Sequence, residues 1–208
     1  MNSGYILSYT SAALSSYECE TVASLYLDTK SWTEVQRLVI EENAIQKGTL
    51  TSRKRLFSEL KKRLMTLTDA QLAYYPEASS TEVKALTMLG CFKLYRLIYD
   101  FASEVMRRKL LLFDYQLLNS DYESFYDSKR VAYENLNTIS EATQKKLKQV
   151  MFRMFEQTEL IDSVKNKHIQ KPYLSEKILT LIVQDNPQYL SGFLYSDTEI
   201  EELTQRYR

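Results

Sequence analysis

The chain has 208 residues, which allows one domain or two small ones, and its hydrophobic content of 44% is ordinary for a globular protein. Its 27 basic and 27 acidic residues give a formal net charge of +0, which argues against a protein that binds nucleic acid over its whole surface. Only 4 Gly and 3 Pro are present, and this shortage of turn formers favours helices over a fold of many strands.

The cysteines and the apolar segments indicate the setting of the chain. Cys19 and Cys91 are the only cysteines, and two distant cysteines form no disulfide framework, so a reducing, cytoplasmic location fits best. The N-terminus lacks the charged and apolar regions of a signal peptide. Residues 83–113 are the most apolar segment, but charged residues interrupt it, and we expect no membrane span. This pattern predicts a central helix instead, with a possible break near Gly90.

Four Ser-x-x-Glu patterns, at Ser15, Ser31, Ser79 and Ser196, predict where helices begin. In such a capping box the Ser oxygen accepts a hydrogen bond from a backbone N–H, and the Glu reaches back to the N–H of the Ser. Apolar residues at helical spacing follow each pattern. Together they predict an all-α fold, with helices at about residues 16–29, 32–43, 51–67, 69–75, 80–113, 121–132, 141–160, 176–184 and 198–206.

The turn-forming segment 119–121 is the best candidate boundary in this series of helices. It predicts two helical lobes, residues 1–118 and residues 119–208. In the second lobe, Pro172 and a polar stretch interrupt short apolar pieces, which favours a small β-hairpin at about residues 161–174. A hairpin that follows a helix resembles the wing of a winged helix.

Residues 31–67 predict two short helices joined by a tight connection, an arrangement similar to a helix-turn-helix. From Thr51 to Met65 there are six basic residues and one acid, Glu59, which gives this segment a net charge of +5. Concentrated positive charge on a rigid helix neutralises phosphates and releases counterions. A solvated face that only keeps the helix in solution is the alternative. The candidate DNA-binding residues here are Arg53, Lys54, Arg55, Lys61, Lys62 and Arg63.

A second basic island lies in the helix expected at 141–160 and in the hairpin after it. Apolar residues such as Leu147 and Phe155 recur at helical spacing and predict a core face, which leaves the basic residues outside. Glu156 lies among these basic residues and dilutes their charge, so a solvated surface is an equal alternative to DNA contact here. The candidate DNA-binding residues are Lys145, Lys146, Arg153, Lys165 and Lys167.

The sequence indicates no catalytic, metal or cofactor site. His168 is the only histidine, whereas a zinc site needs several Cys or His ligands at close spacing. No phosphate-binding loop, dinucleotide fingerprint or nucleophile elbow occurs. The 16 tyrosines could stack on single-stranded bases, but several fall at helical spacing and are expected at the edge of the core. We therefore expect a protein that is not an enzyme and has no small-molecule substrate.

Five segments in order carry a resemblance to a known family: residues 31–43, 51–64, 95–105, 139–154 and 169–175, with motifs such as Ser31-Trp32-x-Glu34 and Ile169-Gln170-x-Pro172. Together they resemble the BrxA family of BREX (bacteriophage exclusion) phage-defence systems. The resemblance implies a small non-catalytic component, with two helical lobes joined by a β-hairpin element. It also implies binding to double-stranded DNA and action beside other BREX proteins.

These observations predict a non-catalytic protein whose basic helices contact the phosphate backbone of double-stranded DNA. The competing hypothesis is a protein–protein adaptor whose basic islands meet acidic protein surfaces and not DNA. A dimeric transcriptional regulator is a third and weaker hypothesis, because the sequence shows no obvious dimerisation zipper.

Overall fold

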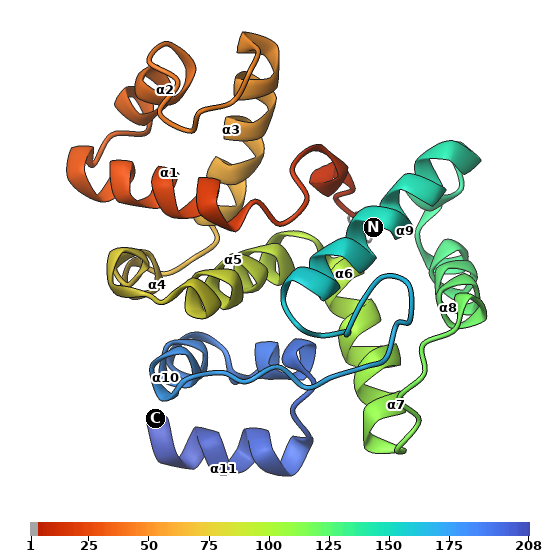
Figure 1. Cartoon of the computed structure of the whole chain (residues 1–208). Helices are drawn as coiled ribbons and strands as arrows, with labels where there is room; N and C mark the ends of the chain where they lie inside the picture. Colours follow the sequence, from red (N-terminus) through yellow and green to blue (C-terminus); the bar gives the residue numbers. More distant parts are fainter. Residues whose placement is uncertain (1–3) are drawn as a thin grey trace.

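The structure, a computed structural model, describes residues 4–208 and is helical throughout (Figure 1). No β-strand occurs in this part of the chain, and the prediction of an all-α fold is confirmed. The α-helices are α1 Ser16–Thr29, α2 Trp32–Ile40, α3 Leu50–Leu64, α4 Asp69–Ala73, α5 Ser80–Leu94, α6 Arg96–Asp100, α7 Arg107–Leu111, α8 Asn119–Ala132, α9 Glu141–Gln157, α10 Glu176–Asp185 and α11 Asp197–Tyr207. The short turn η1 Ser8–Ser11 precedes α1, and between the helices lie the turns η2 Tyr75–Glu77, η4 Glu134–Leu136 and η5 Pro187–Phe193 and the π-helix η3 Phe101–Met106.

Two of the four predicted capping boxes close completely. The side chains of Ser79 and Ser196 each accept a hydrogen bond from the N–H three residues later, and the glutamate there accepts one in return. At Ser31 only the first bond forms, because the carboxylate of Glu34 turns towards an arginine of the same helix. At Ser15 no cap forms, since this residue has a left-handed backbone and donates its hydroxyl to a carbonyl before it.

The long apolar helix breaks at Tyr95 and not at Gly90, so the predicted position of the break is wrong. Tyr95 separates α5 from α6, and its hydroxyl is held by groups of α3. Gly90 has a different role: a Cβ there would lie 3.3 Å from the carbonyl oxygen of Arg63, closer than most such contacts. The glycine therefore lets α5 cross close to α3, and the break occurs where a tertiary contact holds the chain.

The predicted wing is also wrong, because residues 161–174 form no strands. Only isolated bridges join Gln116 to His168 and Ile161 to Ile169. The Asp162 carboxylate accepts hydrogen bonds from backbone N–H groups on both sides of the turn. This side chain closes a compact turn by itself, and the flanking pieces are too short to build a ladder.

One buried apolar core extends through both predicted lobes. In Figure 1, α10 lies next to α5 and α11 lies beyond α10, and side-chain contacts join both helices to elements before residue 119. Gln71 of α4 donates to the Leu181 carbonyl at 3.0 Å, and Arg107 pairs with Asp197 at 2.5 Å. The division at residue 119 stays a prediction, and many contacts cross it. None of the helices in residues 4–208 has both the length and the apolar character that crossing a membrane requires.

Arg63 lies in the core and not on the surface, which corrects its prediction as a DNA-binding residue. Only 1% of it is exposed, and its guanidinium donates to the Tyr95 hydroxyl at 3.0 Å and to the Leu14 carbonyl at 2.9 Å. The Tyr95 hydroxyl donates in turn to Glu59, which also accepts from Ser8 at 2.7 Å. A buried charge is costly unless it is hydrogen-bonded, so this network fixes how α3, the start of α6 and the N-terminal segment meet.

We expect Arg63→Ala to lower the free energy of unfolding by about 3 kcal/mol, because it leaves buried polar partners without their donor. Urea unfolding followed by circular dichroism measures this decrease. Arg55→Ala is the matched control on the exposed side of the same helix, with an expected change of about 0.5 kcal/mol or less. Equal unfolding curves for Arg63→Ala and the wild type would contradict the buried network.

Glu82 links the start of α5 to the start of α10 and predicts an acid-sensitive contact. Burial alone would raise its pKa, but hydrogen bonds from Ser175, Ser79 and Tyr74 lower the pKa of Glu82 from 4.5 to about 2. A lowered pKa in the folded state stabilises the protein above the unfolded value, and this contribution disappears as the pH falls.

We therefore expect the free energy of unfolding of the wild type to fall from about pH 4.5 towards pH 2. The part of this decrease that protonation of Glu82 causes should be absent in Glu82→Gln. Chemical unfolding across this pH range measures the difference between the two proteins. Glu201→Gln, an exposed change on α11, should follow the wild-type curve. A Glu82→Gln curve parallel to the wild type at every pH would show that the contact is not formed.

Candidate nucleic-acid interface

The two basic islands of the sequence meet at one groove of the structure. The groove has a volume of about 510 Å³ and lies between the N-terminal half of α3 and the middle of α9. Its floor is the segment 10–15, which includes the end of η1 and lies between the two helices in Figure 1. Three of the predicted DNA-binding residues line it: Arg55, Lys146 and Arg153.

Packing of α3 places Arg55 in the groove. Leu56, Phe57 and Leu60 are buried as the apolar spacing predicts, and Arg55 lies on the exposed side of the helix. Glu59 is the one acid of the basic segment, and only 4% of it is exposed because it turns inwards to Tyr95. Burial would raise the pKa of Glu59, but these hydrogen bonds lower it, so the carboxylate stays ionised inside. The exposed side of α3 around Arg55 therefore carries no carboxylate of this helix.

Helix α9 contributes the other wall in a similar way. Ser140 caps its start, and Leu147, Met151 and Phe155 are buried as predicted. Lys146 and Arg153 lie two turns apart on the exposed side and both reach the groove. Glu156, which the sequence predicts to dilute this charge, accepts a hydrogen bond from the backbone of the following turn.

The groove carries positive charge that the protein itself does not neutralise. In residues 4–208 no carboxylate forms an ion pair with Arg55, Lys146 or Arg153, whereas neighbouring cations such as Lys62 and Lys148 are paired. Unpaired cations that converge from two rigid helices form a site for an anion, and a polyanion can occupy all of them at once.

The remaining candidates on α3 do not share this groove. Lys54 lines a separate hollow next to α2, and Lys61 lies 5.6 Å from the centre of the Trp32 ring. Arg53 is half-buried, and Lys62 pairs with Glu59 at 3.4 Å. The connection between α2 and α3 spans residues 41–49, which is longer than the usual turn of about four residues in a helix-turn-helix, and that motif stays a prediction.

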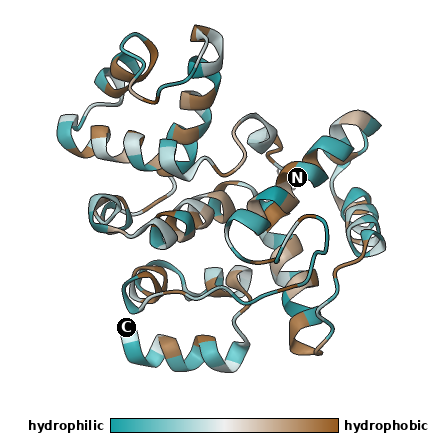
Figure 2. Cartoon of the chain, viewed as in Figure 1, coloured by the Kyte–Doolittle hydropathy of each residue, from teal (hydrophilic) through white to brown (hydrophobic). Residues whose placement is uncertain are grey.

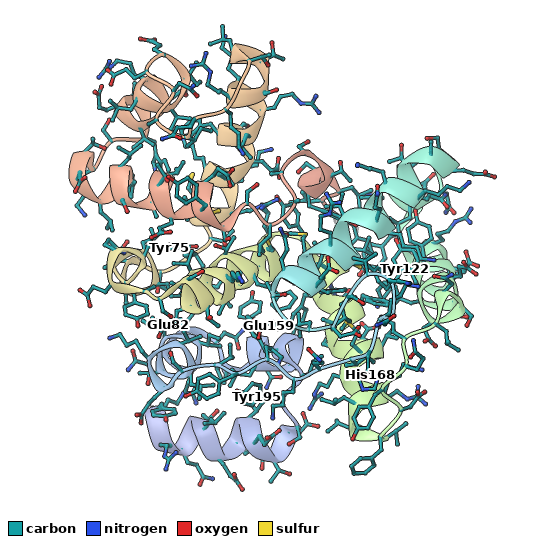
Figure 3. All side chains as sticks on the ribbon, viewed as in Figure 1. Tyr75, Glu82, Tyr122, Glu159, His168 and Tyr195 are labelled. Atoms are coloured by element: carbon teal, nitrogen blue, oxygen red, sulfur yellow. The ribbon has the colours of Figure 1, made fainter. Side chains whose placement is uncertain are left out.

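The candidates on the 163–168 turn lie elsewhere. Lys145 is exposed near the start of α9, but Lys165 and Lys167 belong to the turn that follows this helix. Figure 3 shows His168, the neighbour of Lys167, beside α7 and far from α3. Lys167 is close to Asn119 at 3.4 Å, so this turn is a basic region separate from the groove.

Sequence reasoning missed part of the groove. Lys47, in the connection before α3, lines it and pairs with Glu18, and Ser11, Ser15 and Ser52 bring hydroxyl groups. No local pattern marks these residues, because they come together only when the N-terminal segment folds between the two helices.

The N-terminal segment holds the two walls in position. Its turn η1 packs against both α3 and α9. Ser8 donates a hydrogen bond to Glu59 of α3, and the backbone of Tyr5 exchanges two hydrogen bonds, of 3.3 and 2.9 Å, with Asn135 of η4, in the connection between α8 and α9. Tyr9 is fully buried against the ring of Tyr95. The spacing of Arg55 and Arg153 is thus set by tertiary contacts of residues 5–15.

Comparison with known proteins agrees with this fold. Residues 3–186 match the family model BrxA. The chain is 27% identical over 170 residues to a BREX protein BrxA of Bacillus cereus (strain H3081.97). The aligned region covers 81% of this chain and 82% of the relative.

A crystal structure of an uncharacterized protein from Magnetospirillum magneticum superimposes with a TM-score of 0.82 over 92% of this chain and 98% of the other, at 19% identity. This likeness establishes a shared fold. The family match extends over most of the sequence and agrees with the named relative. The chain therefore belongs to the BrxA family and is a protein of BREX phage defence.

Proposed function

We propose that this protein is a non-catalytic component of its BREX system that binds double-stranded DNA through the groove between α3 and α9. The observation that carries the proposal is the convergence of Arg55, Lys146 and Arg153 without carboxylate partners. Lysine and arginine side chains that neutralise phosphates release condensed counterions, and this release supplies most of the affinity of such contacts.

The shape of the groove suits a sugar–phosphate backbone. Its walls are two helices and its floor carries serine hydroxyls, which are common donors to phosphate oxygens. Arginine can also bind phosphate with two parallel hydrogen bonds, and Arg55 and Arg153 come from opposite walls. Contacts of this kind position a duplex without reading its bases, so we expect strong salt dependence and modest sequence preference.

Exposed cations outside the groove would extend the contact along the duplex. Lys54 and Lys145 are exposed near the starts of α3 and α9, the two helices that form the walls of the groove. Lys165 and Lys167 do not line the groove and belong to a turn that lies away from α3, and we assign them no part in DNA binding.

A protein–protein adaptor is the second candidate function, and one observation favours it. An exposed apolar segment at the end of α7 is unlike the rest of the surface and does not suit a phosphate backbone. An adaptor that lacks DNA affinity would bind no duplex even at low salt, which separates the two candidates.

The double change Arg55→Gln with Arg153→Gln tests the groove. We expect the affinity for any duplex to fall and the slope of log K against log salt to become shallower by about 2, one unit for each phosphate-binding side chain removed. Fluorescence anisotropy with two unrelated duplexes, titrated across salt, measures both quantities.

Lys165→Gln with Lys167→Gln is the matched control, because it removes the same charge from an exposed basic region outside the groove. The wild-type slope should remain in this control. If the control reduced the affinity as much as the groove variant does, net charge and not the groove would determine binding, and the assignment to α3 and α9 would be wrong.

A further inference from the structure

Residues 111–118, here called the apolar loop, expose an unusual amount of apolar surface. The loop begins at the last residue of α7, and this end of the helix is coloured as hydrophobic in Figure 2. Single exposed apolar residues are normal, but a contiguous group on a monomer usually marks a contact site. The group consists of Leu111, Leu112, Phe113, Tyr115 and Leu118, which are 45%, 67%, 79%, 37% and 52% exposed.

The backbone of the apolar loop is held in place although its side chains are not. At one end the N–H of Phe113 donates to the Leu110 carbonyl at 3.0 Å, which closes the last turn of α7. At the other end the Tyr115 carbonyl accepts from the N–H of Ile169 at 2.7 Å. Apolar side chains on an ordered backbone can bind a partner with little loss of conformational entropy.

Phe113 combines two unfavourable features. Its φ of +59° lies in the left-handed region, which is uncommon for a bulky residue, and its ring is the most exposed of the group. The left-handed conformation ends α7, since the N–H of Asp114 donates to the Lys109 carbonyl at 2.9 Å across it. The end of the helix therefore holds Phe113 where its side chain lies in solvent.

The charges around the apolar loop define the partner. The nearby carboxylates Asp114 and Asp121 are both paired with Lys109, at 2.5 and 3.3 Å. In contrast, Arg108 and Lys165 are exposed and form no ion pair with any residue of the described chain. The 163–168 turn adjoins the loop, since Gln116 donates to a carbonyl of that turn at 2.6 Å. Asp162, which closes this turn, is exposed and forms no ion pair within residues 4–208 either. With Arg108, Lys165 and Lys167 beside it, the border of the loop keeps a small excess of positive charge.

We propose that the apolar loop docks another protein of the BREX system, at an apolar groove bordered by carboxylates. This surface is separate from the basic groove: α7 ends at the opposite end of the molecule from α3 in Figure 1. The inference does not depend on DNA binding. It adds a contact through which one chain could join DNA to a second protein.

The same observations argue against two other occupants. A second copy of this chain would bring two positively charged borders together, and like charges at a symmetric contact repel. A lipid surface would have to accept Asp114, which stands in the middle of the apolar run and whose side chain is 55% exposed. A protein groove can leave this ion pair at its rim in water.

The experiment uses the full chain, immobilised, and the other proteins of the same BREX system, purified and passed over it one at a time in biolayer interferometry. We expect one of them to bind the wild type and to bind Leu112→Ser with Phe113→Ser at least tenfold more weakly. Arg108→Glu with Lys165→Glu tests the charged border independently, with a similar decrease expected. Val131→Ser is the matched control, because Val131 is 91% exposed and lies apart on α8.

Three outcomes would overturn the proposal. The first is that no protein of the system binds, or that one binds both double variants as tightly as the wild type. The second is a concentration-dependent dimer in sedimentation velocity that the Leu112 and Phe113 changes abolish. The third is co-sedimentation with vesicles of phosphatidylglycerol and phosphatidylethanolamine that the same changes abolish.

Discussion

The buried guanidinium of Arg63 is the contact on which the functional surface depends. It joins α3 to Tyr95 at the break between α5 and α6, and to the Leu14 carbonyl in the N-terminal segment. Through Tyr95 the same network reaches Glu59 and Ser8. A buried cation is tolerated only when surrounding polar groups are held in place to accept its hydrogen bonds. These hydrogen bonds fix the position of α3, and Arg55 of this helix therefore faces α9 across the N-terminal segment.

The sequence predicts the helices well because their signals are local. Ser79 and Ser196 begin helices with complete capping boxes, and the apolar spacing in α3 and α9 identifies the buried faces. The same local reasoning fails at Arg63 and Tyr95. A helical wheel shows a charged residue on a flank, but it cannot show that a second helix and the N-terminal segment cover that flank. The wing fails for a similar reason, since the Asp162 side chain satisfies the backbone that strands would have paired.

The groove could be predicted only in part. Arg55 and Arg153 stand out in sequence because each lies in a basic helix, but they are far apart in the chain and nothing local predicts that they face each other. Their approach is a tertiary property, set by the packing of η1 on both helices. The apolar loop presents the opposite case. Its composition looks like core, and only the structure shows that its side chains lie in solvent.

The central claim is that the two basic helices form one DNA-binding site. Isothermal titration of the protein with a duplex of about 12 base pairs, slightly longer than one helical turn, tests it directly through the stoichiometry at low salt. One duplex bound per chain is the predicted result, because Arg55, Lys146 and Arg153 would contact the same backbone. Two duplexes per chain would show that the islands act separately, and no bound duplex would show that the groove has another ligand.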